Sequence, residues 1–330
     1  MALRSSSAAC TFLLVWVCSS GWAFSQQLRL EEVPSVEPSA DVYRRLPLDD
    51  DQRAKLRAAV EARQYTRAEE MLASEIERQP KSPMLLSAVG SIFFLDGKYL
   101  NCAVAMKKAE AIAPLSDRDR FTLALSYIIL DHRDWARPEL EKLAASEPLN
   151  ARYPYWLGRL DYDAMRFKDA ANRFRESLGL DAHFMKAYDS LGLTYEALAL
   201  YDDAIRAYEE GIRLNRELPD PSPWPDLNLA TLLIKLAKFE DARKALEESL
   251  RYDSRFPQAH YQMGLLLEKE RKDQEAIQEL NLAVRYDISF PEPHYALGRV
   301  YQRLGDKSKA DSEWATFQKL KAEKPDGRPH

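Results

Sequence analysis

Apolar residues recur along most of the chain at steps of three and four, in runs that come in pairs. A short break rich in glycine, aspartate and lysine divides each pair, as in the stretches LGDKSKADSEW and LAKFEDARKAL. Steps of three and four place apolar side chains on one face of an α-helix. Prolines often close the second run, and Pro80, Pro114 and Pro148 stand 34 residues apart. The pattern therefore predicts repeated units of two helices.

The same residue types return with a period of 34 residues, which is typical of a stacked array. One copy contains Leu191, Gly192, Tyr195, Ala204 and Tyr208, and the third copy after it contains Leu297, Gly298, Tyr301, Ala310 and Trp314. We expect the small residues to let helices approach closely and the large ones to fill the space between them. The repeats cover residues 49–324 as eight units, which begin near Asp49, Pro83, Asp117, Ala151, Met185, Pro223, Pro257 and Pro291.

This pattern resembles that of the tetratricopeptide repeat family, whose signature is a large residue, Leu-Gly, tyrosine, alanine, an aromatic residue or leucine, and a late proline. The resemblance implies an all-α fold: a right-handed superhelical solenoid of about eight helix-turn-helix repeats. Three units depart from the signature, because Leu56, Ala124 and Ala230 stand where it has glycine. An insertion, residues 219–222, separates the fifth and sixth units and is expected to form an exposed loop.

Residues 1–25 differ from the rest of the chain and predict an export signal. Arg4 is followed by the apolar run TFLLVWVC and then by small residues at Ala23 and Ser25, the order found in a cleavable signal peptide. An uncleaved anchor is the alternative, but the apolar stretch is shorter than the roughly 20 residues of a membrane-spanning helix. Cleavage before Gln26 would leave no integral membrane segment, and the protein is expected in the periplasm, the cell envelope or outside the cell.

Two short segments flank the predicted array. Residues 26–48 carry three prolines among glutamate, serine and valine, so we expect an extended or disordered leader. Residues 325–330 are expected to form a frayed tail. Neither segment is long enough to form a second domain.

The charge balance argues against one class of partner. The formal net charge is −5, and no basic patch stands out, whereas nucleic-acid binding needs concentrated lysine and arginine. Cys10 and Cys18 lie in the export signal, which leaves Cys102 without an internal disulfide partner. Cys102 occupies an alanine place, so a small buried hydrophobic residue is expected there rather than a reactive thiol.

No motif for catalysis is present. The sequence lacks GxSxG, HExxH, GxxxxGK[ST] and GxGxxG, so we expect no enzyme activity and no cofactor. His260 and His294 are 34 residues apart, and packing between helices explains this register better than a metal site does. The rival enzyme hypothesis, a carbohydrate- or peptide-processing activity, rests only on Arg159, Asp161 and Asp163.

The resemblance implies that the first helix of each unit lines a concave groove that binds a peptide or an extended protein segment. Mapping the inward places onto this chain gives the expected partner-binding residues: Phe94, Phe121, Leu125, Ile128, Arg152, Tyr155, Arg159, Tyr162, Leu193, Leu227, Tyr261, Tyr295 and Arg299. Two arginines interleaved with tyrosines would suit a partner with hydrophobic and acidic side chains. Packing against the neighbouring repeat is the alternative for some of these residues.

The prediction that combines these points is an exported, non-catalytic scaffold for protein–protein interaction. The alternative is a structural subunit of an envelope assembly or secretion machine. The sequence leaves the identity of the partner and the oligomeric state open, because a fold does not fix a function.

Overall fold

The computed structural model describes residues 40–323, in which it has seventeen helices and no strand. The helices are α1 (Ala40–Arg45), α2 (Asp50–Glu61), α3 (Tyr65–Arg78), α4 (Pro83–Leu95), α5 (Tyr99–Glu110), α6 (Asp117–Ile129), α7 (Arg133–Ser146), α8 (Arg152–Asp163), α9 (Phe167–Leu180), α10 (Met185–Ala197), α11 (Tyr201–Arg216), α12 (Trp224–Lys235), α13 (Phe239–Tyr252), α14 (Pro257–Lys269), α15 (Asp273–Tyr286), α16 (Pro291–Arg303) and α17 (Lys307–Glu323).

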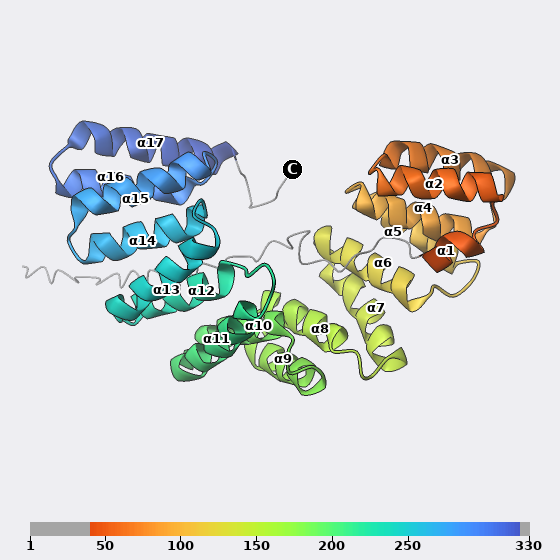
Figure 1. The fold of residues 1–330 in the computed structure, drawn as a ribbon, viewed down its shortest axis with the longest axis horizontal. Coiled ribbons are helices and arrows are strands. Elements are labelled where there is room, and N and C mark those ends of the chain that lie inside the picture. The colour runs from red at the N-terminus through yellow and green to blue at the C-terminus, as the bar shows by residue number, and fades with distance from the viewer. Residues whose placement is uncertain (1–39, 324–330) are drawn as a thin grey trace, which may run out of the picture.

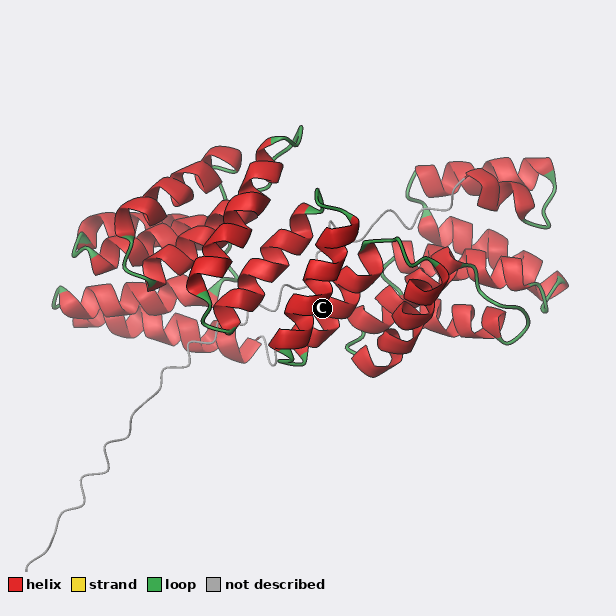
Figure 2. Ribbon diagram, turned by 90° about the horizontal axis from the view of Figure 1, so that it is seen from below, coloured by secondary structure: helices red, strands yellow, loops and turns green. Residues whose placement is uncertain are grey.

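Helices α2 to α17 form eight consecutive pairs, which we number unit 1 (α2 and α3) to unit 8 (α16 and α17). Figure 1 shows the units stacked into an open arch, with α8 and α10 on its inner side and α9 and α11 on its outer side. Short turns join successive helices, as the view from below shows (Figure 2). The predicted all-α solenoid of helix-turn-helix units is confirmed.

The turn inside each unit has the same backbone geometry in all eight copies. One residue per turn has positive φ, and these residues are Arg63, Gly97, Asp131, Met165, Ala199, Ala237, Arg271 and Gly305. The next N–H then bonds back to a carbonyl near the end of the first helix, as from Arg166 to Asp161 at 2.8 Å. This is the bond of a Schellman cap, which satisfies carbonyls that the helix end would otherwise leave unpaired.

A close approach between the two helices explains the glycine of the repeat. A Cβ on Gly192 would lie 2.5 Å from the ring of Tyr208, and one on Gly298 would lie 2.2 Å from Nε1 of Trp314. The small residue therefore makes room for the large one on the second helix, as the pattern predicts. In unit 1 Leu56 occupies the glycine place and is itself buried in the core.

The first turns of the described chain correct one expectation. Residues 40–48 belong to the segment expected to be extended or disordered, but α1 is helical and Tyr43, Leu46 and Leu48 are buried with Leu56. These three side chains cover apolar surface of α2 that the end of the stack would otherwise expose to water. The predicted export signal, the rest of the leader and the tail lie outside the described residues.

The insertion between units 5 and 6 is held by a single side chain. Asn215, near the end of α11, donates from Nδ2 to the carbonyl of Ser222 and accepts from the N–H of Ser222, both at 2.8 Å. Pro219 and Asp220 are exposed, as expected, whereas Ser222 is half-buried. The loop therefore has one fixed end, immediately before α12 begins.

Candidate functional site

The thirteen residues expected to bind a partner differ in exposure. The buried ones are Phe94, Leu125, Ile128, Tyr155, Arg159, Leu227 and Tyr261. The half-buried ones are Phe121, Tyr162 and Leu193, and the exposed ones are Arg152, Tyr295 and Arg299. The buried side chains take part in packing between helices, the exposed ones are open to a partner, and contact with a partner stays a prediction for all of them.

The residues from units 4 and 5 form an aromatic cluster beneath the surface. The ring of Tyr155 lies 4.8 Å from that of Phe184 and 5.9 Å from that of Phe174, measured between centroids. Arg159 donates from Nη1 to the Tyr155 hydroxyl at 3.1 Å, and its guanidinium carbon lies 5.9 Å from the Trp156 ring. The ring of Tyr155 thus packs against Phe184, the residue just before α10.

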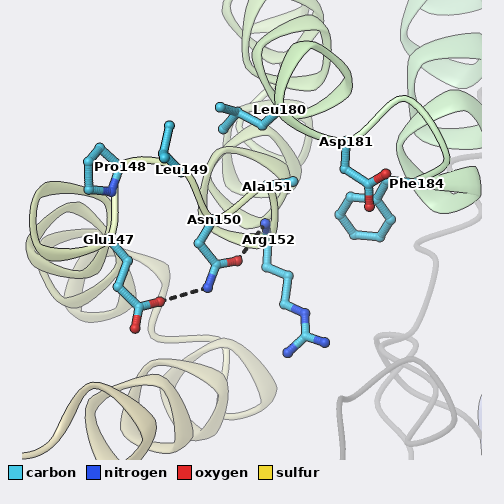
Figure 3. Close-up of a pocket in the computed structure, with 9 residues that line it drawn as sticks. All are labelled: Glu147, Pro148, Leu149, Asn150, Ala151, Arg152, Leu180, Asp181 and Phe184. Atoms are coloured by element: carbon cyan, nitrogen blue, oxygen red, sulfur yellow. Dashed lines mark hydrogen bonds between the residues drawn. The ribbon is translucent and has the colours of Figure 1, made fainter.

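A pocket of about 800 Å³ opens at the edge of the arch above this cluster. It lies between two loops that connect consecutive units, residues 147–151 and 181–184, and Figure 3 shows its lining. Leu149 is 82% exposed and Leu180 is 37% exposed, and Phe184 forms part of the wall. Arg152, the first residue of α8, is exposed and points away from Leu149 (Figure 3). We call this the edge pocket.

The first of the two loops is rigid because its polar groups bond to one another. Asn150 donates from Nδ2 to Glu147 at 2.8 Å and accepts from the N–H of Arg152 at 3.2 Å. The Tyr153 hydroxyl also donates to Glu147, at 2.9 Å. Burial raises the pKa of Tyr153, and the bond to Glu147 raises it further. These hydrogen bonds hold the backbone of the loop between Glu147 and Tyr153, where Leu149 and Arg152 stand.

Polar bridges join the first helices of units 5 and 6 and those of units 7 and 8, in addition to apolar packing. Asn228 donates to Asp189 at 2.7 Å, and Lys235 forms an ion pair with Glu196 at 3.1 Å. Further along, Arg299 pairs with Glu268 at 2.7 Å, and its guanidinium lies 5.5 Å from the Tyr295 ring. This half of the array therefore offers charged groups that already have partners.

Asp161 and Asp163, the carboxylates of the rival enzyme hypothesis, form ion pairs with arginines. Asp161 is buried and accepts hydrogen bonds from Arg137 at 2.6 Å and from Arg166 at 2.7 Å. Asp163 pairs with Arg133 at 3.2 Å. Arginines from α7 and from the turn after α8 thus neutralise both acids, and nothing in this arrangement resembles a pair of groups converging on a substrate.

His260, His294 and Cys102 each have a partner within the array. His260 Nδ1 lies 2.7 Å from Glu279, and His294 Nδ1 lies 2.6 Å from Glu313 on the equivalent helix. No group of three metal-ligating side chains occurs within residues 40–323. Cys102 is buried beside Ser126, and burial raises the pKa of its thiol to about 12, which makes it an inert packing residue.

The edge pocket was not among the sequence predictions, because its exposed leucines lie on loops rather than on the inward face of a first helix. The sequence gives no clear signal, because unit 3 has Leu115 at the place of Leu149. Leu115 is buried and Leu149 is exposed, and only the structure separates the two.

Comparison with known proteins identifies the repeat. Two sequence profiles described as tetratricopeptide repeat match the chain, one over residues 186–218 and one over residues 227–289. None of the curated proteins matches it. No helix within residues 40–323 is long and apolar enough to cross a membrane.

Several solved structures share the fold. A tetratricopeptide repeat protein from Parabacteroides merdae is 17% identical with a TM-score of 0.62, and the alignment covers 79% of this chain and 99% of that one. The APC/C hetero-tetramer Cut9–Hcn1 contains a chain that is 17% identical with a TM-score of 0.59, and the alignment covers 74% of this chain and 48% of that one. Yeast Tom70 is 16% identical with a TM-score of 0.59, and the alignment covers 78% of this chain and 55% of that one. The chain spans about half the length of the last two, and at these identities the likeness is one of fold alone.

Proposed function

Because this chain belongs to the tetratricopeptide repeat family, we propose that it is a non-catalytic scaffold that binds a segment of another protein. The proposal places the first contact at the edge pocket rather than along the whole concave face. The edge pocket supports it through one observation: its lining carries an exposed leucine, Leu149, and an exposed arginine, Arg152, three residues apart in the chain. An apolar side chain and a positive charge that line one pocket suit a segment with apolar and acidic side chains.

A related structure supports the same kind of activity. Cut9 was crystallised as a hetero-tetramer with Hcn1, so a solenoid of this fold can hold a second polypeptide. The units of the present chain form an arch, with the first helices of units 4 and 5 on its inner side (Figure 1). Binding would then draw on several shallow contacts, with the edge pocket as the anchor.

We further propose that the protein is exported, on the basis of residues 1–25. The amino terminus of the protein purified from its native cells would then be Gln26. Amino-terminal sequencing tests this directly, and an intact Met1 on a cytosolic protein would sink the proposal.

The binding test is a crosslinking pull-down from native cells with a Leu149→Asp, Arg152→Glu double variant. Both side chains are exposed, so the melting temperature is expected to stay unchanged while the dominant crosslinked partner is lost. Leu100→Asp is the matched control, because Leu100 is 62% exposed and lies on α5, far from the pocket in the chain. Retention of the same partner by the double variant would refute the role of the edge pocket.

A further inference from the structure

One position in the first helix forms the same kind of polar pair in three units. Arg120 in unit 3, His260 in unit 7 and His294 in unit 8 are the fourth residues of their units. Each bonds to a glutamate at one equivalent place on the second helix, and these glutamates are Glu139, Glu279 and Glu313. A basic group on the first helix thus meets an acid on the second helix.

Unit 6 breaks this pairing at both places. Its fourth residue is Asp226, an acid where units 3, 7 and 8 have a base, and the place of the glutamate is taken by Ala245. Asp226 is 2% exposed, and its Oδ2 has no hydrogen-bond partner among the residues that the structure describes. A buried carboxylate oxygen without a hydrogen-bond partner is costly, and a cation that donated to it would offset that cost.

Space for such a cation is present at the same place. A pocket of about 470 Å³ lies between α11, α12 and α13 and is lined by both Asp226 and Ala245. Its apolar walls are Ile205, Ile212, Leu229 and Leu233. The pocket lies at the boundary where residues 219–222 are inserted, and Asn215 fixes the end of that insertion next to it.

We propose that this pocket binds the side chain of a lysine or arginine from another polypeptide, with its cationic head at Asp226. The hydrocarbon stem would pack against the four apolar walls, and the cation would complete the polar pair that units 3, 7 and 8 form internally. Arg216 and Arg251 attract the Asp226 carboxylate, but neither donates a hydrogen bond to its Oδ2. The site lies apart from the edge pocket, so failure of either proposal leaves the other standing.

The test is an NMR titration of the full-length mature chain with N-acetyl-lysine methylamide, followed through the methyl groups of Ile205 and Ala245. The neutral control ligand is N-acetyl-norleucine methylamide, which keeps the stem and lacks the charge. We expect the lysine probe to shift these methyl signals and to bind at least roughly tenfold more tightly than the norleucine probe, the difference typical of a charged hydrogen bond. Equal binding of the two probes, or no shift with either, would overturn the proposal.

Two variants separate the site from general effects on the fold. Asp226→Asn keeps the shape of the side chain and is expected to lose at least roughly tenfold in affinity for the lysine probe. Asp226→His combined with Ala245→Glu rebuilds the pair seen as His260 and Glu279, fills the pocket and should abolish binding while the fold is kept. Unchanged affinity in either variant would contradict the assignment to Asp226.

A third ligand distinguishes a polypeptide side chain from a free amine. The diamine 1,5-diaminopentane carries the same ammonium group without the backbone amides of the lysine probe. We expect it to bind more weakly than the lysine probe. If it binds more tightly, the occupant is a free amine and the proposal of a polypeptide partner falls.

Discussion

Units 6 and 7 are neighbours with the same backbone but different interiors. In unit 7 the imidazole of His260 bonds to Glu279 at 2.7 Å and, through Nε2, lies 3.1 Å from the carbonyl of Ser254. In unit 6 the equivalent Asp226 keeps one oxygen without a partner beside an open pocket. The repeat therefore copies its apolar packing from unit to unit but not its polar pairs. Unit 6 combines a missing polar pair with an unpaired buried oxygen and a pocket, and this combination supports the proposed ligand site.

The largest effect is expected from removing the polar pair of unit 7. Glu279→Ala gives unit 7 the alanine of unit 6 and leaves the buried His260 without its acceptor. We expect the free energy of unfolding to fall by about 1–3 kcal/mol, the cost of an unsatisfied buried polar group. Urea denaturation at pH 6 measures this loss, with Glu275→Ala, an exposed residue of the same helix, as the control.

The same loss should depend on pH. Burial lowers the pKa of His260, but the bonds to Glu279 and to the Ser254 carbonyl outweigh burial, so the pKa is raised from its ordinary value of 6.5. A raised pKa means that the pair contributes fully below pH 6.5 and that the contribution is lost as the pH rises through the pKa of the folded protein. Glu279→Ala should therefore cost less at pH 9 than at pH 6. An equal cost at both values would show that His260 is neutral throughout.

The buried acid of unit 6 should respond to pH in the same direction, at lower pH. Burial raises the pKa of Asp226 to about 6, and the nearby Glu248 adds to this, while Arg216 and Arg251 act against it. The charged groups around the pocket are Glu209, Arg213, Arg216, Lys238, Asp241, Lys244 and Glu248. Because the folded state holds the Asp226 proton more tightly than the unfolded state, this group favours folding below about pH 4 and loses that effect as the pH rises through 6.

The corresponding variant is Asp226→Asn in the absence of any amine. Removal of the buried charge should raise the free energy of unfolding by about 1 kcal/mol at pH 7.5 and have a smaller effect at pH 4. Paired urea titrations of both proteins isolate Asp226, because all other groups titrate alike in the two. A loss of stability at pH 7.5 would mean that the charged carboxylate already has an internal partner.

The sequence predicts the frame of this molecule well, because the frame rests on period and residue size. Gly192 opposite Tyr208 is visible as a small residue followed by a large one at a fixed spacing, and the structure places them in contact. Contacts between segments that the repeat does not relate are harder to predict from the sequence. The cover that Tyr43 and Leu48 give to unit 1 was missed, because prolines and acids around them read as an extended leader.

The edge pocket and the pocket at Asp226 could not be predicted from the sequence, for different reasons. Leu149 stands on a loop, and its exposure depends on how far two loops are held apart. In the sequence Asp226 looks like an ordinary acid in the first turn of a helix, where its negative charge would interact favourably with the helix dipole. Only the alignment of Asp226 with His260, and of Ala245 with Glu279, together with the burial of the site, shows that its pairing is missing.

The smallest expected effect concerns the turn that the two units share. Ala237 in unit 6 and Arg271 in unit 7 have φ of 57° and 65° at the same place, where units 2 and 8 have Gly97 and Gly305. A side chain at positive φ is strained, so glycine at either place should stabilise the folded protein by roughly 0.5–1 kcal/mol. The two gains, measured by urea denaturation, should be equal because the backbone is the same. Unequal gains would mean that the pocket of unit 6 also loosens its turn, and the difference between the units would then extend beyond one polar pair.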